Sequence, residues 1–364
     1  MGLSCGIVGL PNVGKSTLFN ALTKAGVEAS NYPFCTIDPN VGIVKVPDPR
    51  LNKISEISKS KATIPTTVEF VDIAGLVKGA SKGEGLGNQF LTHIKQVNAI
   101  CHIIRCFEDE NVIHVSGGVN PISDKEIIDT ELCLADLDVV EKNLSKNEKL
   151  IKSGDKNVLI KIEALRKVKP LLEQGKSARH AHLTDDEKFQ IQDLHLMTIK
   201  PVLYVCNVNE SDVVNGNDFV RKVEAVAKEE GAKVVVVSAR IESEIAEMND
   251  EEQQTFLEEL GLKESGLNRM IRSGYELLNL ITYFTAGEKE SRAWTITRGT
   301  KAPGAAGVIH TDFEKGFIRA EIYHCDALFD LKSEQAVKEK GLLRLEGKEY
   351  VMKDGDVAHF RFNV

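Results

Sequence analysis

The chain has 364 residues, of which 42% are hydrophobic and 27% are charged. This composition is typical of a globular protein, and the length is enough for two or three domains. No apolar run approaches the roughly 18 residues of a membrane-spanning helix, and the seven cysteines lack the paired spacing of a metal site. The short N-terminal apolar stretch runs directly into a glycine-rich loop, which argues against a cleavable signal peptide. We therefore expect a cytoplasmic protein that has no membrane partner.

The first predicted element is a strand, a glycine-rich turn and a helix within residues 5–24. Its centre, Gly9-Leu-Pro-Asn-Val-Gly-Lys-Ser-Thr17, has the spacing of a Walker A phosphate loop. The two glycines let backbone N–H groups point at phosphate oxygens, and the start of a helix adds to this anion site. Lys15 is expected to reach the β- and γ-phosphates and to act in catalysis, and Ser16 to bind Mg²⁺. The predicted nucleotide contacts in this loop are Asn12, Val13, Gly14, Lys15, Ser16 and Thr17.

The next two segments carry the residues of a magnesium and γ-phosphate site. A strand predicted at 67–72 ends in Asp72-Ile-Ala-Gly75, where the acid would hold Mg²⁺ through water and the Gly75 N–H would sense the γ-phosphate. The polar loop Asn31-Tyr-Pro-Phe-Cys-Thr-Ile-Asp38 places Thr36 where its hydroxyl would complete the Mg²⁺ shell while γ-phosphate is present. The predicted Mg²⁺ ligands are therefore Ser16, Thr36 and Asp72.

The group that activates water is left open by the sequence. Leu76 follows Gly75 at the position where Ras-type enzymes carry a water-orienting glutamine, so unassisted hydrolysis is expected to be slow. His114 lies in a polar loop just past an apolar strand predicted at 99–107, where an imidazole could face the γ-phosphate, although a lone loop histidine is more often structural. Asn12 resembles the asparagine of potassium-assisted P-loop NTPases, which makes K⁺ the second candidate.

Past residue 124 the apolar residues take the spacing of a helical hairpin. Leu137, Leu144 and Ile151 recur every seven residues, and a second apolar row starts at Val158. The net charge of the chain is −8, yet residues 142–179 contain 11 basic and four acidic side chains. A basic arm of this kind favours contact with RNA phosphates, and the alternative is a solvated helical face.

Two further strands are predicted at 200–207 and 233–239, so the helical arm is an insertion in a mostly parallel α/β sheet. The first of these strands ends in Asn207-Val-Asn-Glu210, where GTPases carry Asn-Lys-x-Asp. Glu210 replaces the aspartate that reads guanine, whereas the amide of Asn207 or Asn209 suits the donor and acceptors of adenine. The motif therefore favours ATP and leaves residual GTP binding open. Ser238 and Ala239 follow the second strand, and their backbone N–H groups are expected to contact the base.

Beyond residue 280, apolar and polar residues alternate as they do in half-buried strands. The four predicted strands are 294–297, 317–323, 348–353 and 357–362, and the turn signals are Pro303-Gly304, Gly307 and Asp354-Gly355. The sequence thus predicts a nucleotide-binding domain at 1–124 and 198–278, an inserted coiled-coil arm at 125–197, and a small β-rich domain at 279–364.

Taken together, these motifs resemble the YchF family of P-loop NTPases, also called Obg-like ATPases. The resemblance spans the chain and includes the motifs at 9–17, 31–36, 72–88 and 207–210, and Gly307-Val-Ile-His-Thr-Asp-Phe-Glu-Lys-Gly-Phe317. It implies an α/β P-loop domain, a helical coiled-coil insertion and a C-terminal α+β TGS domain of ubiquitin-like type. It also implies hydrolysis of ATP in preference to GTP, association with the ribosome, and a catalytic role for His114. Arg240 departs slightly from the usual pattern of the base loop.

The favoured interpretation is a Mg²⁺-dependent ATPase switch whose arm and C-terminal domain contact the ribosome or ribosomal RNA. One alternative is a P-loop small-molecule kinase, although the sequence shows no arginine-rich lid. The other is a non-catalytic RNA-binding scaffold that holds nucleotide only as a ligand.

Overall fold

In the computed structural model the described residues are 3–24, 40–74, 86–109, 118–151 and 154–363. They belong to two compact units, one made of Met1–Gly42 and Glu69–Gly274, the other of Ile43–Val68 and Tyr275–Val364. Four predicted residues, Thr36, Gly75, Leu76 and His114, lie outside the described residues. None of the described helices is long and apolar enough to cross a membrane.

The first unit is built on a six-stranded sheet with the strand order β2-β4-β1-β5-β6-β7. The strands of this sheet are β1 (Ser4–Val8), β2 (Val41–Lys45), β4 (Thr67–Asp72), β5 (Ala99–Arg105), β6 (Val202–Asn207) and β7 (Lys233–Val237), and the division of the chain into units falls within β2 and β4. The pairings from β4 through β1, β5 and β6 to β7 are all parallel. Every residue of β1, β5 and β6 is buried, as expected for central strands of an α/β sheet with helices on both faces. The predicted α/β fold is confirmed.

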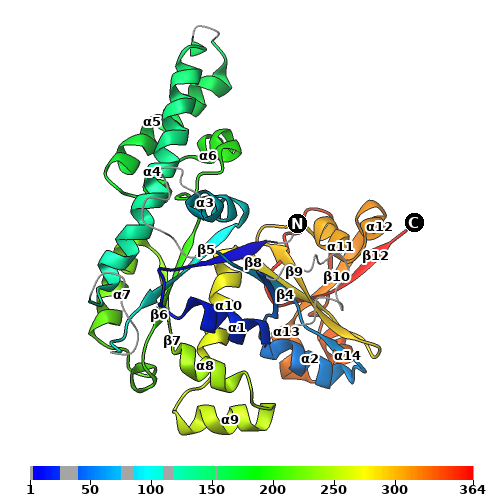
Figure 1. Ribbon diagram of the computed structural model, residues 1–364. Helices are drawn as coiled ribbons and strands as arrows, with labels where there is room; N and C mark the ends of the chain where they lie inside the picture. Colours follow the sequence, from blue (N-terminus) through cyan, green and yellow to red (C-terminus); the bar gives the residue numbers. More distant parts are fainter. Residues whose placement is uncertain (1–2, 25–39, 75–85, 110–117, 152–153, 364) are drawn as a thin grey trace. The chain divides into compact units, whose positions relative to one another are not determined.

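The helices of this unit are α1 (Lys15–Lys24), α3 (Leu86–Gln96), α4 (Pro121–Glu148), α5 (Lys156–Glu173), α6 (Asp185–Ile191), α7 (Asp218–Glu230), α8 (Ala239–Ile245), α9 (Asp250–Glu259) and α10 (Gly266–Leu277). They follow the strands singly or in groups, with α4, α5 and α6 between β5 and β6 and α8, α9 and α10 after β7 (Figure 1). Several begin at side-chain caps, for example Asn120 before α4 and Asp155 before α5. Such caps satisfy N–H groups that have no partner inside the helix.

The helical arm is an antiparallel pair of helices, α4 and α5, which pack against each other (Figure 1). Most residues of the apolar rows that predicted it join one cluster, in which Leu144, Leu165 and Val168 are buried. Ile151, the last residue of the predicted seven-residue row, is instead 40% exposed. The row therefore stops packing before the hairpin turn.

A connector of four residues, Met197–Lys200, joins the arm to β6 and is held at both ends. Asp136 of α4 accepts hydrogen bonds from the N–H groups of Met197 and Thr198 at 3.0 and 2.7 Å and from the Thr198 hydroxyl at 2.6 Å. The Lys200 amine donates to the backbone carbonyls of Ile94 and Lys95 at 2.7 and 2.8 Å, where α3 ends. The connector thus links the arm to the end of α3 by buried polar contacts.

The second unit contains a six-stranded sheet with the order β11-β10-β12-β8-β9-β3. Its strands are β3 (Thr63–Ile64), β8 (Leu280–Thr285), β9 (Ser291–Thr297), β10 (Phe317–His324), β11 (Arg344–Glu346) and β12 (Asp356–Phe362). Its helices are α2 (Pro49–Ser58), α11 (Ala302–Ile309), α12 (Thr311–Lys315), α13 (Cys325–Leu331) and α14 (Glu334–Glu339). The predicted β-rich C-terminal part is therefore confirmed, and it carries more helix than the sequence indicated.

Two apolar clusters contain sheet residues of the second unit. One joins Ala302 and Ala305 of α11 to Tyr283 and Phe317, and the other joins Leu51 and Ile54 of α2 to Phe284 and Leu328. Because α2 contributes to the second cluster, residues 43–68 belong to this unit. This differs from the predicted boundaries, which placed 43–68 inside the domain at 1–124.

Two local predictions in the second unit were wrong. Pro303-Gly304 and Gly307 lie within helix α11, because proline fits the first turn of a helix and small residues let α11 pack closely on the sheet. Residues 348–353 form no strand and contribute only an isolated bridge between Lys301 and Val351. Apolar alternation over six residues did not distinguish a strand from a packed turn.

Buried His102 should make the stability of the protein depend on pH. His102 lies on β5, 3% exposed, and burial lowers its pKa to about 4 because the interior disfavours the charged imidazolium. The unfolded chain takes up this proton below about pH 6.5, whereas the folded chain does not. The free energy of unfolding is therefore unaffected by this group above about pH 6.5. Below that pH it decreases, by about 2 kcal/mol between pH 7 and pH 5.

Urea unfolding at a series of pH values measures this effect. The His102→Gln variant should lose this part of the pH dependence, while His195→Asn, which changes an exposed histidine, should keep it. An unchanged slope in His102→Gln would assign the acid sensitivity to other groups.

Candidate nucleotide-binding site

The phosphate loop lies between β1 and α1, and α1 begins at Lys15 as predicted. Asn12 and Gly14 both adopt left-handed backbone conformations, with φ of 63° and 92°. A Cβ atom on Gly14 would overlap Nδ2 of Asn207, so both the backbone conformation and the space require glycine there. The loop is therefore built as its Walker A spacing predicted, with Val13 buried and Asn12 exposed.

The predicted magnesium residues Ser16 and Asp72 lie on neighbouring elements. Asp72 is the last residue of β4 and pairs in register with Ile7 of β1, two residues before the phosphate loop. Its carboxylate forms an ion pair with the amine of Lys15, and the two side chains are 20% and 12% exposed. Ser16 is exposed in the first turn of α1. A hydroxyl and a carboxylate are the hard oxygen ligands that Mg²⁺ takes, so these residues fit the ion.

The Asn207 side chain joins the phosphate loop to the loop after β7. Its Nδ2 donates to the carbonyl of Val13 at 2.9 Å, and its Oδ1 accepts from the N–H of Ala239 at 2.9 Å. Asn207 is 3% exposed, so both bonds are shielded from water. An amide has a second hydrogen and a second lone pair, and these are left for a ligand. Asn207 therefore has a structural role that the sequence prediction did not include.

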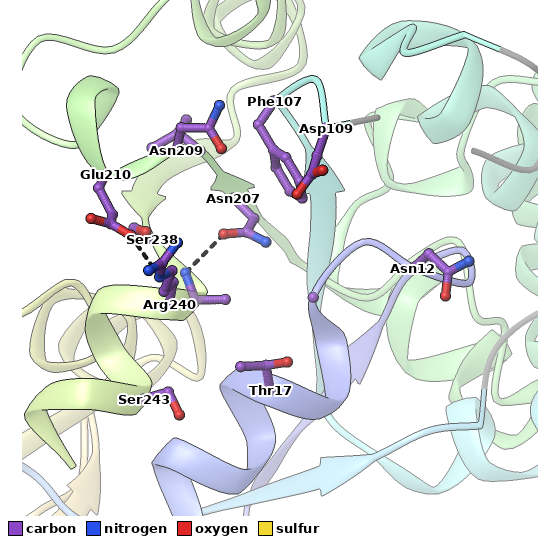
Figure 2. A pocket seen from close by; sticks show the side chains of 13 residues that line it. Asn12, Thr17, Phe107, Asp109, Asn207, Asn209, Glu210, Ser238, Arg240 and Ser243 are labelled. Carbon is purple, nitrogen blue, oxygen red and sulfur yellow. Dashed lines mark hydrogen bonds and ion pairs between the residues drawn. The ribbon is translucent and has the colours of Figure 1, made fainter. Parts of the chain in front are cut away.

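A pocket of about 460 Å³ opens beside the phosphate loop (Figure 2). Its walls come from the loop and from the carboxyl ends of β5, β6 and β7, where open α/β sheets bind ligands. The lining residues are Asn12, Gly14, Thr17, Phe107, Asp109, Asn207, Val208, Asn209, Glu210, Ser238, Ala239, Arg240 and Ser243. The five residues predicted to contact the base, Asn207, Asn209, Glu210, Ser238 and Ala239, all line this pocket.

Glu210 is paired with Arg240 at the rim of this pocket, with 2.8 Å between Oε1 and Nε (Figure 2). The two side chains are 46% and 77% exposed, so the pair contributes at most about 1 kcal/mol. The ion pair nevertheless orients the Glu210 carboxylate toward the Arg240 guanidinium and not toward the space for a nucleotide base. The sequence treated Arg240 as a minor departure, but the structure makes it the partner of Glu210.

The sequence missed the wall formed by Phe107 and Asp109, which follow β5. Buried Arg105 holds this segment: its Nε donates to the Phe107 carbonyl at 3.1 Å, and its guanidinium lies 4.6 Å from the Phe107 ring centre. An aromatic residue just past the end of a central parallel strand was the available signal, because such strand ends meet at one edge of the sheet.

The predicted basic arm carries less free charge than its composition suggests. Five of its basic side chains form ion pairs with acids: Lys142 with Asp138, Lys161 with Asp193, Arg166 with Glu148, Lys167 with Glu187, and Lys169 with Glu141. Three lysines near the hairpin turn, Lys146, Lys149 and Lys156, are exposed beside Leu150 and Leu159, which are 46% and 40% exposed. These three lysines form a basic cluster at the tip of the arm.

Segments at both ends of the chain match known protein families. Residues 4–156 match the family described as 50S ribosome-binding GTPase, and residues 280–363 match the YchF GTPase C-terminal family, described as a protein of unknown function. The chain is 58% identical to the ribosome-binding ATPase YchF of Bacillus subtilis over 366 residues, and 58% identical to that of Escherichia coli O157:H7 over 364 residues. Each match covers 100% of both chains.

A solved structure agrees with these matches. The YchF GTPase of Schizosaccharomyces pombe is 42% identical and superposes with a TM-score of 0.88, over 99% of this chain and 98% of the other. The fold, the phosphate loop and the full-length identity point to the same conclusion. This chain belongs to the YchF family.

Proposed function

We propose that the chain is a Mg²⁺-dependent ATPase that acts as a nucleotide switch on the ribosome. The observation that carries the preference for ATP is the arrangement at the end of β6. Asn207 and Asn209 line the base pocket with amides, while the carboxylate of Glu210, at the position that reads guanine in GTPases, is paired with Arg240. Amides suit adenine, and a carboxylate already paired is less available to the two donors of guanine. The relatives named ribosome-binding ATPase support the same assignment.

The roles of the site residues follow from their positions. Lys15 would neutralise the β- and γ-phosphates, and Ser16 with Asp72 would hold Mg²⁺, which stabilises the charge that develops on the transferred phosphoryl group. Phe107 and Val208 offer apolar contact to the base, and Ser238 with Ala239 offers backbone N–H groups. We assign Thr36 and Gly75 to the γ-phosphate-dependent part of the switch.

The partner-binding parts would be the coiled-coil arm at 125–197 and the TGS domain at 279–364. The tip of the arm combines exposed lysines with exposed leucines, which suits a surface that presents both phosphate and protein. A ribosomal partner would place the chain in the cytoplasm.

Turnover of ATP and GTP by the full-length protein, with and without ribosomes, tests the proposal. We expect release of inorganic phosphate from ATP without any added acceptor, faster than from GTP. Lys15→Ala, which removes the phosphate-binding amine, should be inactive. A requirement for an acceptor would indicate a kinase, and ribosome binding by wild type without turnover would indicate a non-catalytic scaffold.

The choice between His114 and K⁺ as the catalytic aid needs its own comparison. His114→Ala should lower turnover with little change in ATP affinity, whereas replacing K⁺ by Na⁺ should lower turnover only if Asn12 holds K⁺. A parallel fall in affinity would make His114 structural.

Rebuilding the GTPase motif should change the base preference. The double variant Val208→Lys with Glu210→Asp restores Asn-Lys-x-Asp, and we expect the ratio of ATP to GTP affinity to shift toward GTP about tenfold, equal to about 1.4 kcal/mol. Arg240→Ala is the matched control, because it frees Glu210 without adding a lysine. Equilibrium titration with fluorescent analogues of both nucleotides gives the ratio, and an unchanged ratio would place base recognition elsewhere.

A further inference from the structure

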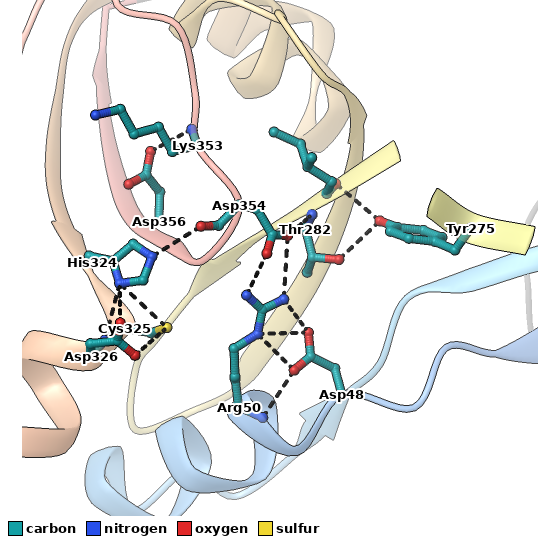
Figure 3. Close-up of polar contacts among 11 residues, drawn as sticks. Asp48, Arg50, Tyr275, Thr282, His324, Cys325, Asp326, Lys353, Asp354 and Asp356 are labelled. Carbon is teal, nitrogen blue, oxygen red and sulfur yellow. Dashed lines mark hydrogen bonds and ion pairs between the residues drawn. The ribbon is translucent and has the colours of Figure 1, made fainter. Parts of the chain in front are cut away.

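Three consecutive residues where β10 meets α13 carry metal-binding atoms (Figure 3). The imidazole of His324, the thiol of Cys325 and the carboxylate of Asp326 have ligand atoms within 4.8 Å of one another. We propose that these three side chains bind a divalent zinc ion in the second unit. Imidazole nitrogen, thiolate sulfur and carboxylate oxygen are the donors that zinc takes in proteins. None of the three residues lines the nucleotide pocket.

The spacing of the donors is close to that of a tetrahedral zinc site. Nδ1 of His324 lies 3.2 Å from a carboxylate oxygen of Asp326, and Sγ of Cys325 lies 4.0 Å from Nδ1 and 3.9 Å from the other oxygen. Tetrahedral zinc with ordinary bond lengths separates such ligand atoms by about 3.4–3.6 Å. A movement of about half an ångström by the exposed Asp326 side chain and the ring would complete the geometry.

The His324 ring is already oriented as a metal ligand. Its Nδ1 accepts from the N–H of Asp326 at 3.3 Å, so its Nε2 carries the hydrogen and donates to the carbonyl of Asp354 at 3.1 Å. A metal-binding histidine usually donates its other N–H to a carbonyl or carboxylate in this way, and its second nitrogen carries the lone pair that binds the ion. Zinc would take Nδ1 in exchange for the long contact to Asp326.

The turn that receives this ring packs closely against it. Gly355 has φ of 88°, and a Cβ there would lie 2.6 Å from Nε2 of His324, so glycine is needed for the ring to fit. The carboxylate of Asp354 binds Arg50 at 2.6 Å and the N–H of Thr282 at 2.9 Å (Figure 3). The carbonyl that orients the ring is therefore fixed by contacts to two other elements.

Two of the three ligands are exposed, so an ion can approach the cluster from solvent. Cys325 is fully buried, while the side chains of His324 and Asp326 are 42% and 75% exposed. Zinc would thus sit above the thiol with one side toward solvent. Three protein ligands and one water make an open zinc site.

A second histidine–aspartate pair in the same unit has the same arrangement but lacks a thiol between the two residues, so it serves as a comparison for the zinc site. At the start of α12, Nδ1 of His310 accepts from the N–H of Asp312 at 3.2 Å and lies 3.4 Å from its carboxylate. Between them stands Thr311, where the first site has Cys325. The His310 pair serves as a helix cap without a thiol, so of these two sites zinc is expected to bind the one at His324–Asp326.

Titration of the full-length protein with Co²⁺, in excess Mg²⁺, tests the site because a thiolate bound to Co²⁺ produces an intense charge-transfer absorption. We expect one equivalent of this signal per chain, displaced by Zn²⁺. Cys325→Ser and His324→Asn should abolish the signal and weaken Zn²⁺ binding at least tenfold, and His310→Asn should leave both unchanged. Asn can replace His324 as a helix cap. Cys35, which lies outside the described residues, is another thiol in the chain. The absorption is therefore assigned to Cys325 only if the Cys325→Ser variant lacks it.

Asp326→Asn keeps the experiment decisive if the Cys325 variant fails to fold. This exposed side chain can be changed without disturbing the core, and Zn²⁺ affinity should still fall about tenfold. Absence of the charge-transfer signal in wild type, or unchanged Zn²⁺ affinity in Asp326→Asn and His324→Asn, would overturn the proposal.

Discussion

Asn207→Ala should weaken the binding of ATP and of GTP by at least 100-fold. The side chain is the only link described between the Val13 carbonyl and the Ala239 N–H, and both bonds are buried. Its removal leaves a buried acceptor and a buried donor without partners, at about 1–3 kcal/mol each. Because these groups shape the phosphate loop and the base loop together, most of this loss should appear in nucleotide affinity.

The measurement is equilibrium titration with fluorescent ATP and GTP analogues. Asn209→Ala is the control, since Asn209 lines the same pocket but is exposed, and its loss should stay below about tenfold. Equal losses for ATP and GTP would indicate that Asn207 acts by holding the loops. A changed ratio would show that its remaining hydrogen and lone pair also read the base, and a loss below threefold would contradict the role assigned here.

Asp136→Ala should destabilise the protein by about 3–5 kcal/mol, because one buried carboxylate satisfies three donors of the connector. Asp136 is 1% exposed, so its carboxylate is shielded from bulk water. Burial raises the pKa of Asp136, which the hydrogen bonds from Thr198 and Met197 oppose. Without the carboxylate, the N–H groups of Met197 and Thr198 would be left without partners inside the protein.

Asp138→Ala is the matched control on the same helix. Its side chain is 61% exposed and pairs with Lys142, which is 72% exposed, so the change should stay within about 0.5 kcal/mol. Urea unfolding compares the two variants. Backbone hydrogen exchange should also increase at residues 86–96 in Asp136→Ala but not in Asp138→Ala. Lys200 of the connector bonds the end of α3, so a loosened connector should loosen this helix. Equal stability of the two variants would mean that the connector relaxes and finds other partners.

The sequence was most informative where one local pattern determines one local structure. The Walker A spacing, the strand ending at Asp72 and the helix starting at Lys15 follow from glycine positions and short-range apolar periods. The base pocket was predicted only in part, because Phe107 enters it through the position of β5 in the sheet, and Arg240 meets Glu210 across two loops.

Helix α11 and the placement of residues 43–68 could not be predicted from local pattern. Glycine and proline in 302–309 indicate a turn when read locally, yet close packing of Ala302 and Ala305 on the sheet favours a helix. Leu51 and Ile54 have the spacing of any amphipathic helix, and the spacing does not say which sheet they cover. These outcomes depend on contacts between distant parts of the chain, which override local propensity.

The second unit is made of two chain segments that lie far apart in the sequence, which affects the order in which it can fold during synthesis. Its first segment, Ile43–Val68, leaves the ribosome about 200 residues before Tyr275 begins the rest of the unit. At a translation rate of about 5–20 residues per second, roughly 10–40 s pass between the synthesis of α2 and that of the strands that Leu51 and Ile54 cover. During translation this amphipathic helix is therefore an exposed apolar segment, and folding of the second unit is confined to the last moments of synthesis or to the time after release.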